Sequence, residues 1–165
     1  MNIRKMVLAS LFASLIAICS WLSISIPPVA LTLQTFGIFL ALGVLGGKWG
    51  SVSVFLYLLL GLVGLPVFSG FRGGAGAFLD PTGGFLWGFL AGALGYWLLE
   101  RFGTIPAMIT AQLICYGCGC RWFSAYAGDA GFRTAVLTCV VPYLLPDAVK
   151  LWLAYVLGKR IKQHI

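Results

Sequence analysis

Charged residues are scarce in this sequence. Only 9% of its 165 residues are Asp, Glu, Lys or Arg, whereas 61% are hydrophobic and the mean hydropathy is +1.00. Four long runs, residues 6–47, 49–71, 81–99 and 102–120, contain no charged residue, and one membrane-spanning helix needs roughly 20 apolar residues. The composition excludes an ordinary soluble domain and predicts an integral membrane protein.

The sequence is also poor in the residue types that catalysis and metal binding use. Its one histidine, His164, lies in the terminal tail, and no Gly-Lys-Ser/Thr phosphate-binding motif occurs. No second carboxylate accompanies Asp147 in the last apolar stretch, and no nucleophile has a recognisable base. We therefore predict no catalytic residue, no metal site and no cofactor.

Five cysteines are present, and three of them, Cys115, Cys118 and Cys120, are clustered at the end of an apolar run. A C-x-x-C spacing is typical of redox or metal chemistry. Free cysteine is, however, among the most buried residue types, and we expect these side chains to be small fillers of the protein interior. A disulfide between Cys115 or Cys118 and Cys120 is left open.

The uncharged runs predict helices, because they are continuously apolar and do not alternate as the strands of a membrane barrel do. The first run is long enough for two spans and is divided by Pro27-Pro28. The fold class is therefore an all-α membrane protein, a bundle of six transmembrane helices in a single domain, residues 1–165. The expected helices are residues 6–26, 32–47, 51–66, 83–100, 104–120 and 134–158.

Lys and Arg are expected in excess on the cytoplasmic side of a membrane protein. An N-terminus inside puts seven of them there: Arg4, Lys5, Lys48, Arg101, Lys159, Arg160 and Lys162. The outer side then holds Arg72, Arg121 and Arg133. We predict a multi-pass protein of the cell (inner) membrane with both termini cytoplasmic. The net charge of +7 fits contact with anionic lipid of the bilayer and needs no nucleic acid partner.

Two opposite charges, Asp147 and Lys150, interrupt the last apolar stretch. Each ion costs roughly 2.5 to 3.5 kcal/mol at mid-membrane on insertion scales, so such residues indicate a functional site. Because residues three apart share one helical face, the pair also has a purely structural interpretation as an ion bridge. The two interpretations are compatible, since a ligand can replace the contact that the empty protein makes.

Glycine is concentrated between the third and fourth expected spans, where it alternates with phenylalanine over residues 64–85. Non-helical backbone at membrane depth persists only where protein or a cavity satisfies its polar groups. We expect this glycine-rich outer loop to cover a pocket, with backbone N–H groups and Arg72 facing inward. The alternative is a compact surface loop without a ligand.

Alanine recurs at every fourth position of the first expected helix, at Ala9, Ala13 and Ala17. Small residues at this spacing form a flat stripe that allows another helix to approach closely. The stripe is either a docking face for a partner protein or a packing face within the same chain.

Four segments in chain order resemble the BioY family, the biotin-specific substrate-binding components of energy-coupling-factor vitamin transporters. The segments are residues 29–35, 64–68, 80–89 (with Pro81-Thr82-Gly83-Gly84) and 142–150 (with Asp147 and Lys150). Two departures occur: Leu145-Pro146-Asp147 stands where the family usually has Pro-Gly-Asp, and Asp80 stands where Gly commonly precedes Pro-Thr-Gly-Gly.

The resemblance implies a six-helix fold with a biotin pocket open to the outside. It also implies partners, namely a transmembrane coupling subunit that meets the stripe of Ala9, Ala13 and Ala17, and two ATP-binding subunits. Biotin has ureido N–H donors, a ureido carbonyl, an apolar thioether ring and chain, and a carboxylate, so its pocket needs an acceptor, a donor, apolar walls and a cation. The candidate binding residues are Asp147, Lys150, Arg72, Gln34, Gly73, Gly74, Thr82, Gly83, Phe68, Tyr143 and Trp87, with Trp152 as a further candidate for the wall.

Two other functions remain as alternatives. A transporter component for another small vitamin-like acid would have a similar pocket. A small intramembrane enzyme using the Asp147–Lys150 pair or the thiols is a different class, which the missing base and second carboxylate disfavour.

Overall fold

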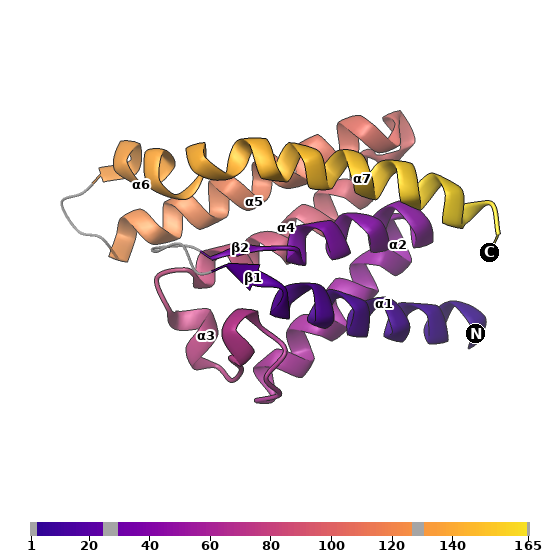
Figure 1. Ribbon diagram of the computed structural model, residues 1–165, viewed down its shortest axis with the longest axis horizontal. Coiled ribbons are helices and arrows are strands. Elements are labelled where there is room, and N and C mark those ends of the chain that lie inside the picture. Colours follow the sequence, from indigo (N-terminus) through magenta and orange to yellow (C-terminus); the bar gives the residue numbers. More distant parts are fainter. Residues whose placement is uncertain (1–2, 25–29, 127–130, 165) are drawn as a thin grey trace.

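The computed structural model describes residues 3–24, 30–126 and 131–164, so the predicted break at Pro27-Pro28 lies outside the described residues. The helices within these ranges are α1 (Ile3–Trp21), α2 (Gln34–Leu62), α3 (Gly76–Leu79), α4 (Gly83–Leu99), α5 (Thr104–Tyr126), α6 (Gly131–Cys139) and α7 (Leu144–Lys162). Three 3-10 turns, η1 (Ser69–Phe71), η2 (Glu100–Phe102) and η4 (Val141–Tyr143), lie between them. After α1, β1 (Ser23–Ile24) pairs with β2 (Leu31–Thr32) in an antiparallel hairpin. Figure 1 shows the long helices side by side, with both termini at the same end of the molecule.

The second and third predicted spans are the two halves of α2, which is broken at Gly46 (φ 78°, ψ 169°). This backbone conformation is open to glycine and strained for other residues. The halves fold back on each other, since a Cβ on Gly50 would lie 2.7 Å from the Cα of Leu42. The second half gains a cap from another part of the chain, because Glu100 Oε2 accepts a hydrogen bond from the Gly47 N–H at 2.6 Å.

The predicted all-α, six-helix membrane fold is confirmed, with α1, the two halves of α2, α4, α5 and α7 as the long helices of the described chain. Among the described residues, three stretches are long and apolar enough to cross a membrane: Ile3–Trp21, Gln34–Leu62 and Gly131–Lys162. The prediction of a continuous last helix over residues 134–158 is wrong, because η4 separates α6 from α7. Pro142 explains the break, since proline lacks an N–H and disfavours a helical conformation in the residue before it.

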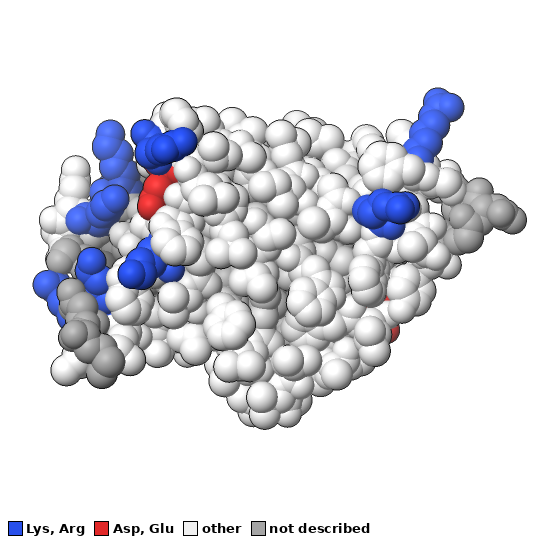
Figure 2. All heavy atoms as spheres, turned by 180° about the vertical axis from the view of Figure 1, so that it is seen from behind, with Lys and Arg blue, Asp and Glu red and all other residues white. Residues whose placement is uncertain are grey.

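The surface of the molecule has charge at its two ends. Figure 2 shows Lys and Arg side chains gathered at both ends of the face in view, with a broad uncharged band between them. Large apolar side chains such as Leu98, Leu113 and Trp152 are exposed on the bundle. A belt of this kind suits lipid, because hydrocarbon takes the place that water has around a soluble protein.

The alanine stripe of α1 lies inside the protein. Ala9, Ala13 and Ala17 are at most 6% exposed, and α1 packs chiefly against α2. Of the two interpretations above, the structure supports packing within the chain, so these alanines are not an exposed docking face. The exposed side of α1 instead carries Ser10 and Ser14.

A second stripe of small residues joins α4 to α5. Gly84, Gly88 and Gly92 recur at every fourth position, and a Cβ on each would lie 2.9, 2.9 and 2.7 Å from a carbonyl oxygen of α5. Such contacts bring two helices together at backbone distance, which is how small residues hold helices in lipid. This close approach sets the position of the polar residues of α5 described below.

We predict that Gly88→Ala lowers the melting temperature of the purified protein in detergent. The new Cβ would lie 2.9 Å from the carbonyl oxygen and 3.0 Å from the Cα of Cys115, and overpacking typically costs about 1–3 kcal/mol. Gly117→Ala on α5 is the matched control, because nothing lies within 4 Å of a Cβ there. Equal melting temperatures for the two variants would contradict a close α4–α5 contact.

Candidate ligand-binding site

A chamber of about 520 Å³ opens at the end of the bundle away from the termini. Its walls come from the starts of α2, α4 and α7, from α5, and from the segment between α2 and α4, residues 63–82. The volume lies within the range of roughly 300–1,000 Å³ that small-molecule sites occupy. The glycine-rich segment contributes seven residues to the lining of the chamber: Phe68, Ser69, Arg72, Ala77, Asp80, Pro81 and Thr82.

The buried end of the chamber holds the predicted charge pair. Lys150 Nζ lies 2.7 Å from Asp147 Oδ1, and the two residues are 7% and 8% exposed. Because α7 begins at Leu144, Asp147 stands in the first turn of a helix and not in the middle of a span. A negative charge is favoured at that position by the helix dipole.

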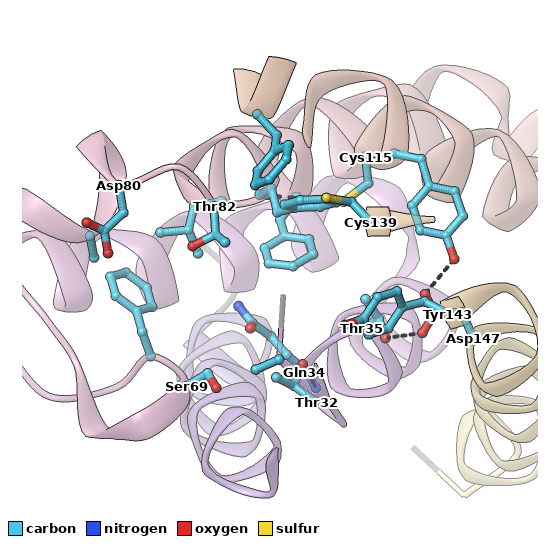
Figure 3. Close-up of a pocket in the computed structure, with 18 of the residues that line it drawn as sticks. Thr32, Gln34, Thr35, Ser69, Asp80, Thr82, Cys115, Cys139, Tyr143 and Asp147 are labelled. Carbon is cyan, nitrogen blue, oxygen red and sulfur yellow. Dashed lines mark hydrogen bonds between the residues drawn. The ribbon is translucent and has the colours of Figure 1, made fainter. Parts of the chain in front are cut away.

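Three further donors hold the carboxylate of Asp147. Tyr116 Oη donates to Oδ2 at 2.6 Å, and Gln112 Nε2 donates to Oδ2 at 3.0 Å. Thr35 Oγ1 donates to Oδ1 at 3.5 Å (Figure 3). With Lys150, these contacts occupy both oxygens of the carboxylate. The ion bridge between Asp147 and Lys150 that the sequence suggested for the empty protein is present, and the Asp147 carboxylate is in addition an internal hub that orients four donors.

Sequence reasoning missed Thr35, Gln112 and Tyr116. A signal for two of them was present, because Gln112 is a polar residue in an apolar run and Tyr116 follows it four residues later on the same helical face. Thr35 has no such signal, since its link to Asp147 spans 112 residues of sequence.

Gln34, the predicted polar residue of the second span, lines the chamber and is 4% exposed. Its Nε2 donates to Tyr57 Oη at 2.8 Å, and its Oε1 accepts from Ser20 Oγ at 3.5 Å. These bonds tie the start of α2 to α1 and to its own second half. No buried side-chain nitrogen or oxygen among the described residues lacks a hydrogen-bond partner, so the polar groups around the chamber are satisfied without a ligand.

The opposite end of the chamber carries a second ion pair. Arg72 Nη1 lies 2.6 Å from Asp80 Oδ2, and about half of each side chain is exposed. Arg72 Nε also donates to the Ser69 carbonyl oxygen at 3.3 Å. Figure 3 shows Asp80 and Asp147 at opposite ends of the chamber, with Thr82 and Gln34 between them.

Two of the four aromatic residues predicted for the apolar wall line the chamber. Phe68 and Tyr143 line the chamber, and Phe68 makes edge contacts with Tyr57 and Phe78. Trp87 and Trp152 do not line it; they are 49% and 62% exposed on the outside of the bundle. Sequence reasoning missed the phenylalanines that complete the wall, Phe85, Phe89 and Phe123.

The loop glycines do not serve as predicted. Gly73, Gly74 and Gly83 belong to the described chain but do not line the chamber, whereas Thr82 does. The Gly74 N–H donates to the Gly61 carbonyl at 2.7 Å, and the Gly83 N–H donates to the Asp80 carbonyl at 2.8 Å. Gly73 packs so tightly that a Cβ there would lie 2.2 Å from the Leu65 carbonyl oxygen. These glycines shape the loop, and the backbone donors of Gly74 and Gly83 are already used.

All five cysteines are free, and four of them are buried, as expected for small interior side chains. Cys115 and Cys139 line the chamber. The disulfide that the sequence left open between Cys115 or Cys118 and Cys120 does not form.

The fold and the chamber define a multi-pass helical membrane protein with an internal chamber whose two ends are polar. Comparison with known proteins identifies the family to which the chain belongs. The chain belongs to the BioY family, whose family model matches residues 1–165.

The relatives and a solved structure agree with this assignment. The biotin transporter BioY of Thermotoga maritima is 40% identical over 165 residues, covering 97% of this chain and 96% of the relative. A probable biotin transporter BioY of Pyrococcus horikoshii is 35% identical and covers 98% of both chains. The fold also matches the crystal structure of the S-component for biotin from an ECF-type ABC transporter, with a TM-score of 0.88 and 27% identity over 99% of this chain and 94% of that chain. The relatives are named as transporters and not as enzymes.

We predict that Lys150→Met destabilises the protein strongly, by about 3 kcal/mol or more, because it leaves the buried Asp147 charge without its cation. The double variant Asp147→Asn/Lys150→Met removes both charges and should recover part of this loss. Thermal unfolding in one detergent, without added ligand, measures both effects. A single variant as stable as the parent would show that Lys150 does not compensate Asp147.

Proposed function

We propose that this chain is the biotin-binding membrane subunit of an uptake system, which captures biotin from the outside and delivers it with an ATP-driven energy-coupling module. The observation that carries the proposal is the chamber itself, which has a buried, hydrogen-bonded charge pair at one end, a half-exposed arginine at the other and aromatic walls between. This polarity matches a ligand with a ureido head, an apolar middle and a carboxylate. Relatives that cover nearly the whole chain are named biotin transporters.

The charges favour one orientation of biotin. A carboxylate placed beside Asp147 would add a second negative charge to a site that is less than a tenth exposed, and burying charge without a partner is costly. At Arg72 the carboxylate meets a cation and stays in contact with water. We therefore place the carboxylate at the Arg72 end and the ureido head at the Asp147 end.

The buried end then has groups for each part of the ureido ring. Lys150 uses one of its three N–H donors on Asp147, which leaves donors for the ureido carbonyl. Tyr116 and Thr35 line the chamber and donate their hydroxyl protons to Asp147, so their oxygens keep lone pairs that can accept from ureido N–H groups. Asp147 thus acts on the ligand through the side chains that it orients.

We predict that Arg72→Gln and Tyr116→Phe separate the two ends of the ligand. Arg72→Gln should weaken binding of biotin about fivefold, the upper range for an exposed ion pair, and leave binding of neutral biotinamide nearly unchanged. Tyr116→Phe removes one buried hydrogen bond and should weaken both compounds equally, about tenfold. Isothermal titration of the purified variants measures both Kd values.

If Arg72→Gln weakened the binding of biotin and of biotinamide equally, the proposed orientation of the ligand would be reversed. Failure of the parent protein to bind either compound would overturn the proposed function. Thermal stabilisation by each compound, measured on the same samples, checks that the variants are folded.

We propose that residues 1–165 form one transmembrane domain in the cell (inner) membrane with both termini in the cytoplasm. Support comes from the seven Lys and Arg residues near the end with the termini, because the cytoplasmic side carries the excess of positive charge. The chamber then opens toward the outside, where the substrate is.

Uptake against a gradient needs energy, and the sequence has no phosphate-binding motif. We propose a transmembrane coupling subunit and two ATP-binding subunits as partners, as the S-component of an ECF-type transporter implies for its own system. Because Ala9, Ala13 and Ala17 are buried, the docking face of α1 is the exposed one with Ser10 and Ser14. Both hydroxyls donate to the carbonyl four residues earlier, so the polar groups of this face are satisfied within α1.

We predict that Ser10→Leu/Ser14→Leu abolishes co-purification with the coupling subunit and leaves biotin binding unchanged, because large side chains block close helix approach. Ala9→Leu/Ala13→Leu is the matched variant on the buried face and should lower the melting temperature by overpacking α1 against α2. Normal assembly of the serine double variant would show that α1 docks through another face.

A further inference from the structure

The segment between α2 and α4 consists of two arms that are anchored to different parts of the bundle. Its first arm, residues 63–74, is attached to α1 and α2. Trp21 Nε1 donates to the Pro66 carbonyl at 2.8 Å, and the Gly74 N–H donates to the Gly61 carbonyl at 2.7 Å. Trp21 also stacks on Phe71 with ring centroids 5.3 Å apart.

The second arm, residues 79–83, is attached to α5. Trp122 Nε1 donates to the Asp80 carbonyl at 3.0 Å, and Tyr126 Oη donates to the Leu79 carbonyl. The backbone of Asp80 is therefore fixed on the α5 side, while its carboxylate reaches across to Arg72 on the other arm.

This contact places a negative group directly on the cation at the mouth of the chamber. Four charged residues line the chamber within the described chain, Arg72, Asp80, Asp147 and Lys150, and their formal charges sum to zero. The two carboxylates differ in their partners. Asp147 is buried and held by four donors, whereas the Asp80 carboxylate is half-exposed and paired with Arg72.

A ligand carboxylate that approaches Arg72 must share the guanidinium with Asp80. Two carboxylates around one cation repel each other, which cancels part of the attraction. A neutral group at the same place does not meet this repulsion. When the anion leaves, Asp80 is already in place as the replacement partner of Arg72.

We propose that Asp80 is a specificity-determining residue, an internal competitor for Arg72 that reduces the preference of the chamber for the free acid over neutral derivatives of the same ligand. The inference rests on the proposed function, because it takes a biotin-like acid as the ligand and puts its carboxylate at the mouth. Asp80 thereby moderates how tightly the acid is held and favours its release.

The test compares biotin with biotinamide by isothermal titration of the full-length protein in a neutral detergent. Asp80→Asn removes the competing charge and should lower the Kd for biotin about three- to fivefold, the size of an exposed charge contact. The Kd for biotinamide should change less than twofold. Asp80→Ser, which removes the same charge with a different side chain, should have the same effect.

Glu100→Gln is the matched control. It removes one negative charge at the opposite end of α4, next to Gly47 and outside the chamber lining. This variant should leave the ratio of the two Kd values at the parent value, which separates a local effect of Asp80 from a change in net charge.

Three results would count against the proposal in different ways. If Asp80→Asn weakened the binding of both compounds equally, the role of Asp80 as a competitor would be overturned. The Arg72–Asp80 ion pair would then be a contact that closes the mouth. If the ratio of the Kd values for biotin and biotinamide stayed at the parent value in Asp80→Asn, Asp80→Ser and Arg72→Gln, the placement of the ligand carboxylate at Arg72 would be overturned. Absence of binding by the parent protein would overturn the proposed function and not the role of Asp80 alone.

Discussion

The carboxylate of Asp147 is the interaction on which the rest of the structure depends. A charge less than a tenth exposed persists only when it is paired and hydrogen-bonded. Here Thr35 of α2, Gln112 and Tyr116 of α5 and Lys150 of α7 all converge on it. One side chain thus ties three helices together at the end of the bundle where the chamber opens.

This hub requires the helices to approach closely and to begin and end at particular residues. The glycine stripe of α4 sets α5 at backbone distance, and α5 then presents Gln112 and Tyr116 on one face. The break at η4 makes Asp147 part of the first turn of α7. A continuous helix would have left the same charge in mid-span, without the favourable end of a helix dipole.

Much of this architecture could be predicted from the sequence, because apolar runs of spanning length and a pair of charges within one of them are strong signals. The sequence does not predict, however, whether a small or aromatic side chain points into the bundle or out toward the lipid. In lipid both the protein interior and the surroundings are apolar, so the alanines of α1 give no sign that they face α2, nor Trp87 that it faces outward. The prediction for the loop glycines is wrong for another reason. Gly74 and Gly83 were expected to offer N–H donors to a ligand, but tight turns use those donors within the backbone.

The two ion pairs of the chamber differ in how readily they can exchange partners. The Asp147–Lys150 pair is shielded from water and belongs to a network with no unsatisfied buried group among the described residues, so separating it would leave buried charge uncompensated. The Arg72–Asp80 pair is half-exposed and contributes little to stability, which means that water or a ligand can replace either partner at small cost. The chamber therefore has a rigid end that defines the shape of the ligand head and a mouth whose charges can rearrange as the ligand passes.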